Sequence, residues 1–182
     1  MGCDIHQKLF IWSRIENKMV PASSVLEDGC MEHMPIIVDE RDYNLFGLFG
    51  NSCRSNYSEL DCLESCGFPD YVSDSTVFGL AEKDGHTWRL CFLDKLGNSL
   101  LEYKERLCDP RKYREYYDDE IDWVTDAIEG RVSPVEYVGR HRDVLDSIEL
   151  TIKRVDNAIK FFSQYNDVVD SGKIALLTWM DS

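Results

Sequence analysis

Residues 109–166 read DPRKYREYYDDEIDWVTDAIEGRVSPVEYVGRHRDVLDSIELTIKRVDNAIKFFSQYN, and they carry the strongest helical pattern in this chain of 182 residues. Asp109 before Pro110 is typical of a helix N-terminus, and Gly130 predicts the end of this first helix. The Ser-Pro-Val-Glu sequence at 133–136 is a capping box with proline at the first helical position, and it predicts a second, longer helix. Apolar residues recur at three- and four-residue spacing in both segments, and the link between them is short. We therefore predict a hairpin of two antiparallel helices.

The two ends of the chain predict strands. Residues 4–14 (DIHQKLFIWSR) alternate in character, so that Ile5, Leu9 and Ile11 fall on one side of an extended chain. Residues 174–181 (IALLTWMD) are an apolar run that fits a terminal strand, although a buried helix fits this length as well.

Together, these predicted helices and strands indicate an α+β fold. We expect a single domain over residues 1–182, with a small mixed or antiparallel sheet that joins the N- and C-terminal strands. The helical hairpin of residues 109–166 is expected as an insertion within this domain. Residues 43–49 fit either a short helix or a loop that plugs the core. Residues 51–85, rich in Ser, Asn, Gly and Asp, predict irregular structure with one short helix near residues 58–66.

The composition limits the partners of the chain. It has 34 acidic and 20 basic residues and a net charge of −14 with neutral histidines, so its long-range field repels the phosphates of duplex nucleic acid and anionic membrane surfaces. We expect neither as a partner. A small anion can still bind where a few arginines converge, because charges beyond a Debye length of roughly 8 Å are screened.

The cysteines and the N-terminal segment bear on the compartment. Seven cysteines, an odd number, and an N-terminus with neither a basic nor an apolar leader predict a cytoplasmic protein with reduced thiols. The spacings of Cys30 with His33 and of Cys62 with Cys66 occur in zinc sites, but the two tight pairs of a structural zinc site are incomplete. Buried thiols explain the second pair better, so we assign no metal there.

Histidine is the scarcest residue that can serve as acid, base or metal ligand, with four in the chain. His6 lies in the first predicted strand, and His86 follows Gly85 in a predicted turn, so both are candidates for function. His141 lies among charged residues on the second helix and is predicted to face solvent. No phosphate-loop, dinucleotide-binding, zinc-protease or nucleophile-elbow motif occurs, which excludes the enzyme classes that carry these motifs.

Several separated motifs resemble one family of small, frequently phage-encoded proteins that begin MGCDIH. The motifs are MGCDIH at 1–6, RDYNLF at 41–46, GFPDYVS at 67–73, HTW at 86–88 and WMDS at 179–182. The match follows the order of the motifs through the chain, while the helical hairpin has no specific counterpart. One departure is that the family often has a second histidine where this chain has an aspartate, two residues before the HTW motif.

The resemblance implies a site built from polar residues that are far apart in sequence. If the first and last strands are neighbours, Asp4, His6 and Asp181 gather at one end of the sheet. The loops that bear Arg41 and His86 would then fold over that end. The implied catalytic residues are His6, His86, Asp4 and Asp181, and the implied ligand-binding residues are Arg41, Tyr43, Arg54 and Trp88.

Three functions follow as expectations. The first is a phosphodiesterase-like hydrolase acting on a nucleotide-like phosphoester, such as a host immune signalling nucleotide, with His6 and His86 as acid and base and Arg41 opposite the phosphate charge. A variant places His6, His86, Asp4 and Asp181 around a divalent metal.

The second is a non-catalytic binder that sequesters such a nucleotide, and the third is an acidic protein-interaction module that inhibits a host factor. The resemblance implies phage origin at most, and counter-defence in the host cytoplasm is an inference from how phages use small accessory proteins. The expected partner is an anionic small molecule such as a nucleotide. No cofactor is assigned, and a homodimer remains open.

Overall fold

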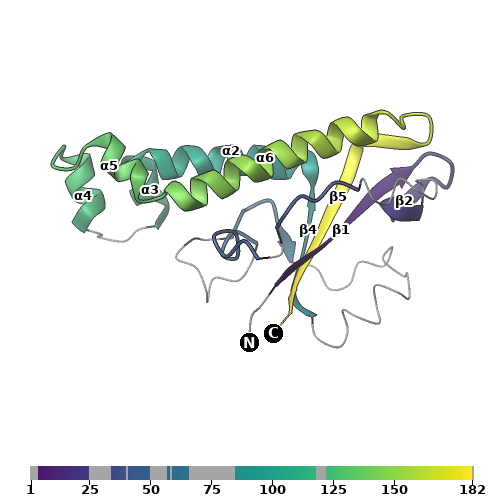
Figure 1. The fold of residues 1–182 in the computed structure, drawn as a ribbon, viewed down its shortest axis with the longest axis horizontal. Coiled ribbons are helices and arrows are strands. Elements are labelled where there is room, and N and C mark those ends of the chain that lie inside the picture. The colour runs from purple at the N-terminus through teal and green to yellow at the C-terminus, as the bar shows by residue number, and fades with distance from the viewer. Residues whose placement is uncertain are drawn as a thin grey trace.

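A single antiparallel sheet of five strands forms one layer of the molecule, and long helices cover it (Figure 1). The computed structural model describes residues 4–24, 34–39, 41–49, 57, 59–65, 85–117 and 122–181, with the backbone alone at residues 64–65, 85–88 and 181. The strands are β1 (Ile5–Ser13), β2 (Lys18–Pro21), β3 (Glu64–Ser65), β4 (Gly85–Phe92) and β5 (Val169–Asp181), in the order β2-β1-β5-β4-β3. The α+β class is confirmed, and the sheet is antiparallel rather than mixed.

The first and last strands are neighbours, as the sequence predicts. β1 pairs with β5 so that Ile5 lies opposite Met180 and His6 opposite Trp179. The predicted alternation in β1 is confirmed, because Ile5, Leu9 and Ile11 are all buried in the main core.

The opposite face of the sheet has a smaller core of its own. Phe10, Ala175 and Leu177 are fully buried there, with Met19, Leu90, Phe92 and Trp179 packed around them. The central strand β5 is therefore buried on both faces, which explains why its sequence is an almost continuous apolar run rather than an alternating one.

Five helices of the described chain follow β4 and precede β5. They are α2 (Leu93–Cys108), α3 (Pro110–Tyr117), α4 (Asp122–Ile128), α5 (Pro134–Gly139) and α6 (Arg142–Ser163). In Figure 1, α2 and α6 run side by side from the sheet to a distant tip made by α3, α4 and α5. None of the helices in the described part of the chain is both long and apolar enough to cross a membrane.

The long antiparallel hairpin is present, but its first arm differs from the expected one. We expected residues 110–128 to pair with the second helix, whereas α6 packs against α2 and the segment 110–128 is divided between α3 and α4 at the tip. α2 has no counterpart among the predicted elements, although it carries a buried stripe at helical spacing, formed by Leu93, Leu96, Leu100, Tyr103 and Leu107. Apolar spacing identifies a helix but does not identify its partner, which explains the error.

The predicted helix boundaries are right at Pro110, where α3 begins, and also at Gly130 and Ser133. Gly130 has a φ of 78°, a conformation that favours glycine, and it follows the end of α4. The Ser133 hydroxyl accepts a hydrogen bond from the Glu136 backbone N–H at 3.2 Å and caps α5. The second helix is nevertheless interrupted, because α5 ends at Gly139 and α6 begins at Arg142.

Expectations were also made for three segments outside the predicted strands and helical hairpin. The loop alternative is correct for residues 43–49, since Leu45, Phe46, Leu48 and Phe49 are fully buried in turn structure. The short helix expected near residues 58–66 is wrong where that segment is described, because residues 61–62 form a turn and Glu64–Ser65 is strand β3. The loop expected to bear His86 after a turn at Gly85 is also wrong, because both residues lie within β4.

Candidate functional site

The first residues of β1 meet the loop that follows residue 34. The Arg41 guanidinium Nε lies 3.4 Å from the Asp4 carboxylate, with the Asp4 side chain 25% exposed and that of Arg41 76% exposed. This contact joins two of the residues singled out by the resemblance, and it confirms that the loop bearing Arg41 folds over the end of the first strand. The carboxylate fixes one edge of the guanidinium, and the rest of this side chain extends toward solvent.

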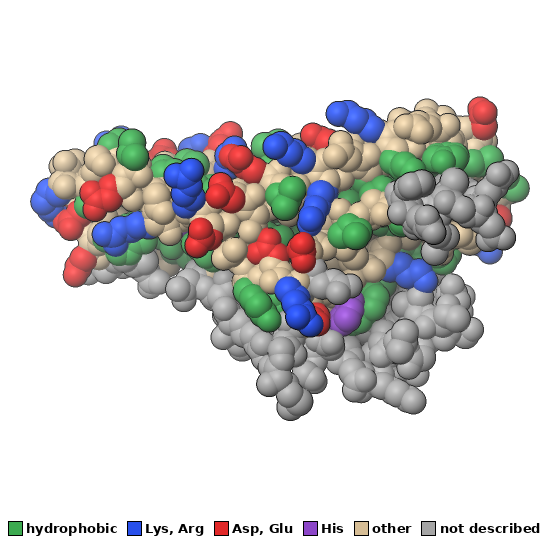
Figure 2. Space-filling model, in the orientation of Figure 1, with side chains coloured by type: hydrophobic (Ala, Val, Ile, Leu, Met, Phe, Trp, Pro, Cys, Tyr) green, Lys and Arg blue, Asp and Glu red, His purple; other side chains and the backbone are tan. Residues whose placement is uncertain are grey.

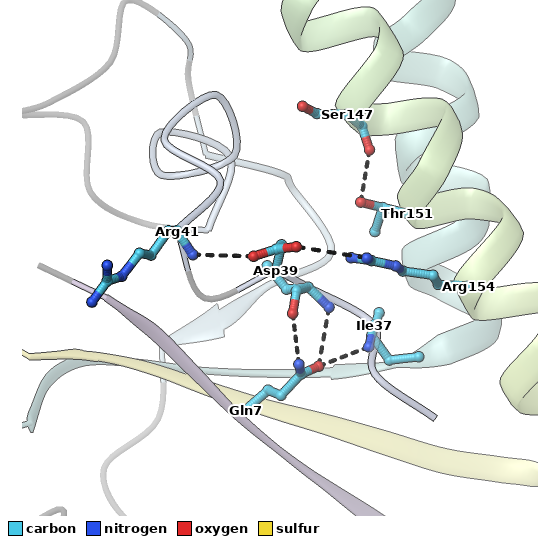
Figure 3. Close-up of polar contacts among 8 residues, drawn as sticks. Gln7, Ile37, Asp39, Arg41, Ser147, Thr151 and Arg154 are labelled. Carbon is cyan, nitrogen blue, oxygen red and sulfur yellow. Dashed lines mark hydrogen bonds and ion pairs between the residues drawn. The ribbon is translucent and has the colours of Figure 1, made fainter. Parts of the chain in front are cut away.

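Gln7 fastens the same loop to the sheet. Its side-chain Oε1 accepts hydrogen bonds from the backbone N–H groups of Ile37, at 2.9 Å, and Val38, at 3.0 Å. Its Nε2 donates to the Val38 carbonyl at 2.6 Å. One amide side chain thus satisfies three backbone groups of a buried segment that belongs to no strand (Figure 3).

Asp39 connects this loop to the long helix α6. Its Oδ2 lies 3.7 Å from an Arg154 guanidinium nitrogen, and its Oδ1 accepts a hydrogen bond from the Arg41 backbone N–H at 3.4 Å. In Figure 3, Arg154 reaches from α6 toward Asp39, while the side chain of Arg41 extends away from it. The Asp39 carboxylate therefore lies between the Arg154 guanidinium and the backbone N–H of Arg41.

Two hollows adjoin at Asp39. The larger has a volume of about 670 Å³ and lies between β1, the 3-10 turn Ala22–Ser24, the loop and α6, with Lys8 and Arg154 in its wall. The shallower one, of about 540 Å³, is lined by Arg41, Tyr43 and α6 residues. Acidic and basic side chains are interspersed over this face of the molecule rather than segregated (Figure 2). The pair of hollows, with Asp39 between them, is called the loop recess below.

Tyr43 supplies an aromatic surface at the shallow end of the loop recess. Its ring is stacked on that of Phe46, with centroids 5.1 Å apart and an interplanar angle of 22°, and the residue is 54% exposed. Because Phe46 is fully buried, the outer ring is held in place by the core. A planar ligand can stack on such a fixed ring without ordering it first.

The backbones of three predicted catalytic residues, His6, His86 and Asp181, lie at one end of the sheet. His6 is opposite Trp179 on β5, while on the other side of β5 Gly85 is opposite Asp181 and His86 is opposite Met180. His6 and His86 thus stand at the same end of the sheet, in adjacent rows of the ladder. The His6 ring stacks on Trp179 at 5.4 Å.

Several candidate residues lie beyond what the structure describes. Arg54 is outside the described residues, and the side chains of His86, Trp88 and Asp181 are too. The acid and base roles of the two histidines therefore stay predictions. Cys30, His33 and Cys66, considered for zinc, are also outside. Among the described residues, no group of three or more His, Cys, Asp or Glu side chains could hold a metal ion.

Sequence reasoning missed three residues of the loop recess: Gln7, Asp39 and Arg154. A signal existed for Gln7, because strand alternation places it on the same face as Ile5 and Leu9, where a polar side chain must find hydrogen-bond partners. No sequence pattern marks Asp39 or Arg154, because their contact depends on how α6 packs over the sheet.

His141 is the clearest error of the sequence reading. It was expected to face solvent, yet it is 3% exposed and lies among the rings of Tyr57, Tyr113, Trp123 and Tyr137. Its Nδ1 is 3.3 Å from the Tyr57 hydroxyl, and its buried Nε2 has no hydrogen-bond partner. Burial lowers the pKa of His141 to about 4. The residue lies where α5 meets α6 and is not part of the loop recess.

No protein family, curated protein or solved structure matches the chain. The local geometry alone therefore supports a functional proposal.

Proposed function

We propose that the protein binds a nucleotide-like phosphoester small molecule in the loop recess. The observation that carries this proposal is that Arg154 and Arg41 each line one of two hollows that adjoin at Asp39 and are large enough for such a ligand. Each arginine is oriented by a carboxylate, and arginine is well suited to phosphate because its planar donors match two phosphate oxygens.

The recess offers different chemistry at its two ends, which favours a nucleotide over a simple anion. Lys8 and Arg154 in the deeper hollow suit phosphate, and the fixed ring of Tyr43 in the shallower hollow suits a stacked base. Asp39, shared by both, can accept hydrogen bonds from sugar hydroxyls. This local arrangement counts more than the net charge of −14, because distant charges are screened.

Calorimetric titration tests the proposal, with ADP-ribose and cyclic di- and trinucleotides as ligands and with adenosine and pyrophosphate as the separate halves. We expect stoichiometric binding of at least one intact nucleotide, tighter than binding of either half. Arg154→Ala should weaken that binding about tenfold to a hundredfold, the range for losing a charge-assisted hydrogen bond.

The matched control is Lys153→Ala, which removes an exposed positive charge from the next position of α6 and should leave the dissociation constant unchanged. Affinity that survives both Arg41→Ala and Arg154→Ala would show that the loop recess is not the site. Absence of binding across the whole panel would instead favour the acidic protein-interaction alternative.

Hydrolysis of the bound phosphoester is the second candidate, favoured by the positions of His6 and Asp181, which share one face at one end of the sheet, whereas the His86 position belongs to the opposite face. There His6 acts as general acid or base. Chromatography after incubation separates the two functions, since new products indicate turnover, whereas ligand recovered intact on heating indicates sequestration. Host immune nucleotides are the first ligands to test, because the resemblance implies a phage origin and phages use small accessory proteins for counter-defence.

His6→Phe gives a selective test of the catalytic role. Phenylalanine keeps a ring to stack on Trp179 but cannot exchange a proton. We expect turnover to be abolished while the melting temperature changes by only a few degrees and nucleotide binding persists. A His6→Phe protein that turns over substrate normally would remove His6 from the mechanism.

A further inference from the structure

Two cysteines far apart in sequence meet beside β4, away from the loop recess. β3 and β4 pair so that Glu64 is opposite Leu90 and Ser65 opposite Arg89. Because the strands are antiparallel, the turn that precedes β3 runs alongside the residues that follow Leu90. This places Cys62, in that turn, next to Cys91.

Both cysteines lie at the main core. Cys91 is buried and belongs to this core, and the half-buried Cys62 packs against it. Their side chains are hydrogen-bonded to each other, and neither cysteine is in a disulfide. A third described cysteine, Cys108, is exposed at the end of α2 and provides an internal comparison.

The hydrogen bond makes the two thiols chemically unequal. The hydrogen bond between the two side chains, helped by the Ser99 side chain on α2, lowers the pKa of Cys62 to about 7 against the opposing effects of burial and Asp61. The Cys91 thiol also donates to the Phe92 carbonyl oxygen at 3.3 Å. The hydrogen bond with Cys62, followed by burial, raises the pKa of Cys91, and the nearby charges of Lys95 and Asp94 act in opposite directions on it. Near neutral pH, Cys62 is therefore partly thiolate, the reactive form, while Cys91 keeps its proton.

We propose that Cys62 and Cys91 form a peroxide-sensitive pair, in which Cys62 is the attacking thiol and Cys91 the resolving thiol. The Cys62 thiolate attacks one oxygen of a peroxide, the O–O bond breaks, and Cys62 becomes a sulfenic acid while the leaving oxygen departs as water or an alcohol. The Cys91 sulfur then attacks the Cys62 sulfur, its proton joins the departing hydroxide, and a disulfide and water form. Two thiols are oxidised, and one peroxide is reduced.

The surroundings allow the sulfurs to approach from hydrogen-bond contact to a covalent bond. Cys62 lies in a turn next to β3, a strand of only two residues at the edge of the sheet, so a small shift does not disturb the central strands. The disulfide would lock this turn to β4. The residue before this turn also contacts the buried loop of residues 43–49, because the Leu60 N–H donates to the Leu48 carbonyl at 3.0 Å. Oxidation would thus make the packing around the buried loop of residues 43–49 more rigid.

Mass spectrometry of the full-length protein tests the proposal. The reduced protein is titrated with hydrogen peroxide, blocked with iodoacetamide and digested without reductant. We expect a peptide linking Cys62 to Cys91, lighter by two hydrogens than its parts, to form first, while Cys108 remains alkylated. Without peroxide at pH 7, Cys62 should react with iodoacetamide at least about tenfold faster than Cys108, whose pKa is raised by burial.

Variants separate the two roles. In Cys91→Ala, a sulfenic acid trapped by dimedone should accumulate at Cys62, and the pH midpoint of its alkylation should rise. Cys62→Ser leaves the buried Cys91 in place and should abolish the link, so the test stands even if Cys91→Ala does not fold. Cys108→Ser should change nothing. A disulfide from Cys62 to another cysteine, or alkylation of Cys62 as slow as that of Cys108, would overturn the pair.

Discussion

Replacing Gln7 with leucine is expected to lower the free energy of unfolding by about 3 kcal/mol, measured by urea denaturation. Leucine has a similar size but leaves two backbone N–H groups and one carbonyl, in the buried segment of Ile37 and Val38, without their partner. Each unsatisfied buried group costs about 1–3 kcal/mol, and relaxation of the loop recovers part of this. The same change should weaken the proposed nucleotide binding, because this segment positions Asp39 and Arg41.

Two further variants sharpen this prediction. Gln7→Glu keeps an acceptor for the two N–H groups but loses the donor to the Val38 carbonyl, so its effect should be smaller than that of leucine. Gln164→Leu makes the same exchange at an exposed position after α6 and should change stability by less than about 0.5 kcal/mol. Equal stabilities of Gln7→Leu and Gln164→Leu would show that Gln7 does not hold the loop.

Acidification from pH 7 to pH 5 is expected to lower the free energy of unfolding by about 2 kcal/mol through His141 alone. Burial lowers the pKa of this imidazole to about 4 in the folded state, against about 6.5 in the unfolded chain. Between these values the unfolded chain binds the proton and the folded one does not. Stability from this residue is therefore fully present above pH 6.5 and is lost progressively as the pH falls toward 4.

Comparison with a variant isolates the contribution of His141 from the other titrating groups. His141→Phe places a non-titratable ring among Tyr57, Tyr113, Trp123 and Tyr137, so denaturation midpoints of this variant should depend less on pH over the same window. His6→Phe, at the far end of the sheet, should retain the full dependence. An unchanged pH profile in His141→Phe would mean that its imidazole titrates normally.

The error at His141 shows what a local pattern omits. Arg140 and Arg142 flank it, and on one continuous helix such a segment faces water. The helix instead breaks between α5 and α6, and His141 adopts a φ of −102° and a ψ of 7°, outside the helical region. The break lets this side chain pack inward while its charged neighbours stay at the surface. Periodicity does not register a break of this kind.

Elements whose determinants are local were predictable. The β1 strand follows from alternation, and the start of α5 follows from its capping box. The pairing of α6 with α2, and of Arg154 with Asp39, depends on contacts between distant segments. Among the site expectations, the adjacency of the terminal strands followed from the sequence, whereas the ion pair of Asp4 with Arg41 also depends on the path of the loop after residue 34.

The position of β5 also has a consequence for the order of assembly. This strand lies between β1 and β4, yet it is synthesised after all the other described elements. Until it emerges from the ribosome, β1 and β4 lack their shared partner and expose unpaired backbone edges, which are prone to aberrant association. The helices can form earlier from local contacts, whereas the sheet is completed by insertion of its middle strand, and a truncated chain ending before residue 169 would keep both edges open.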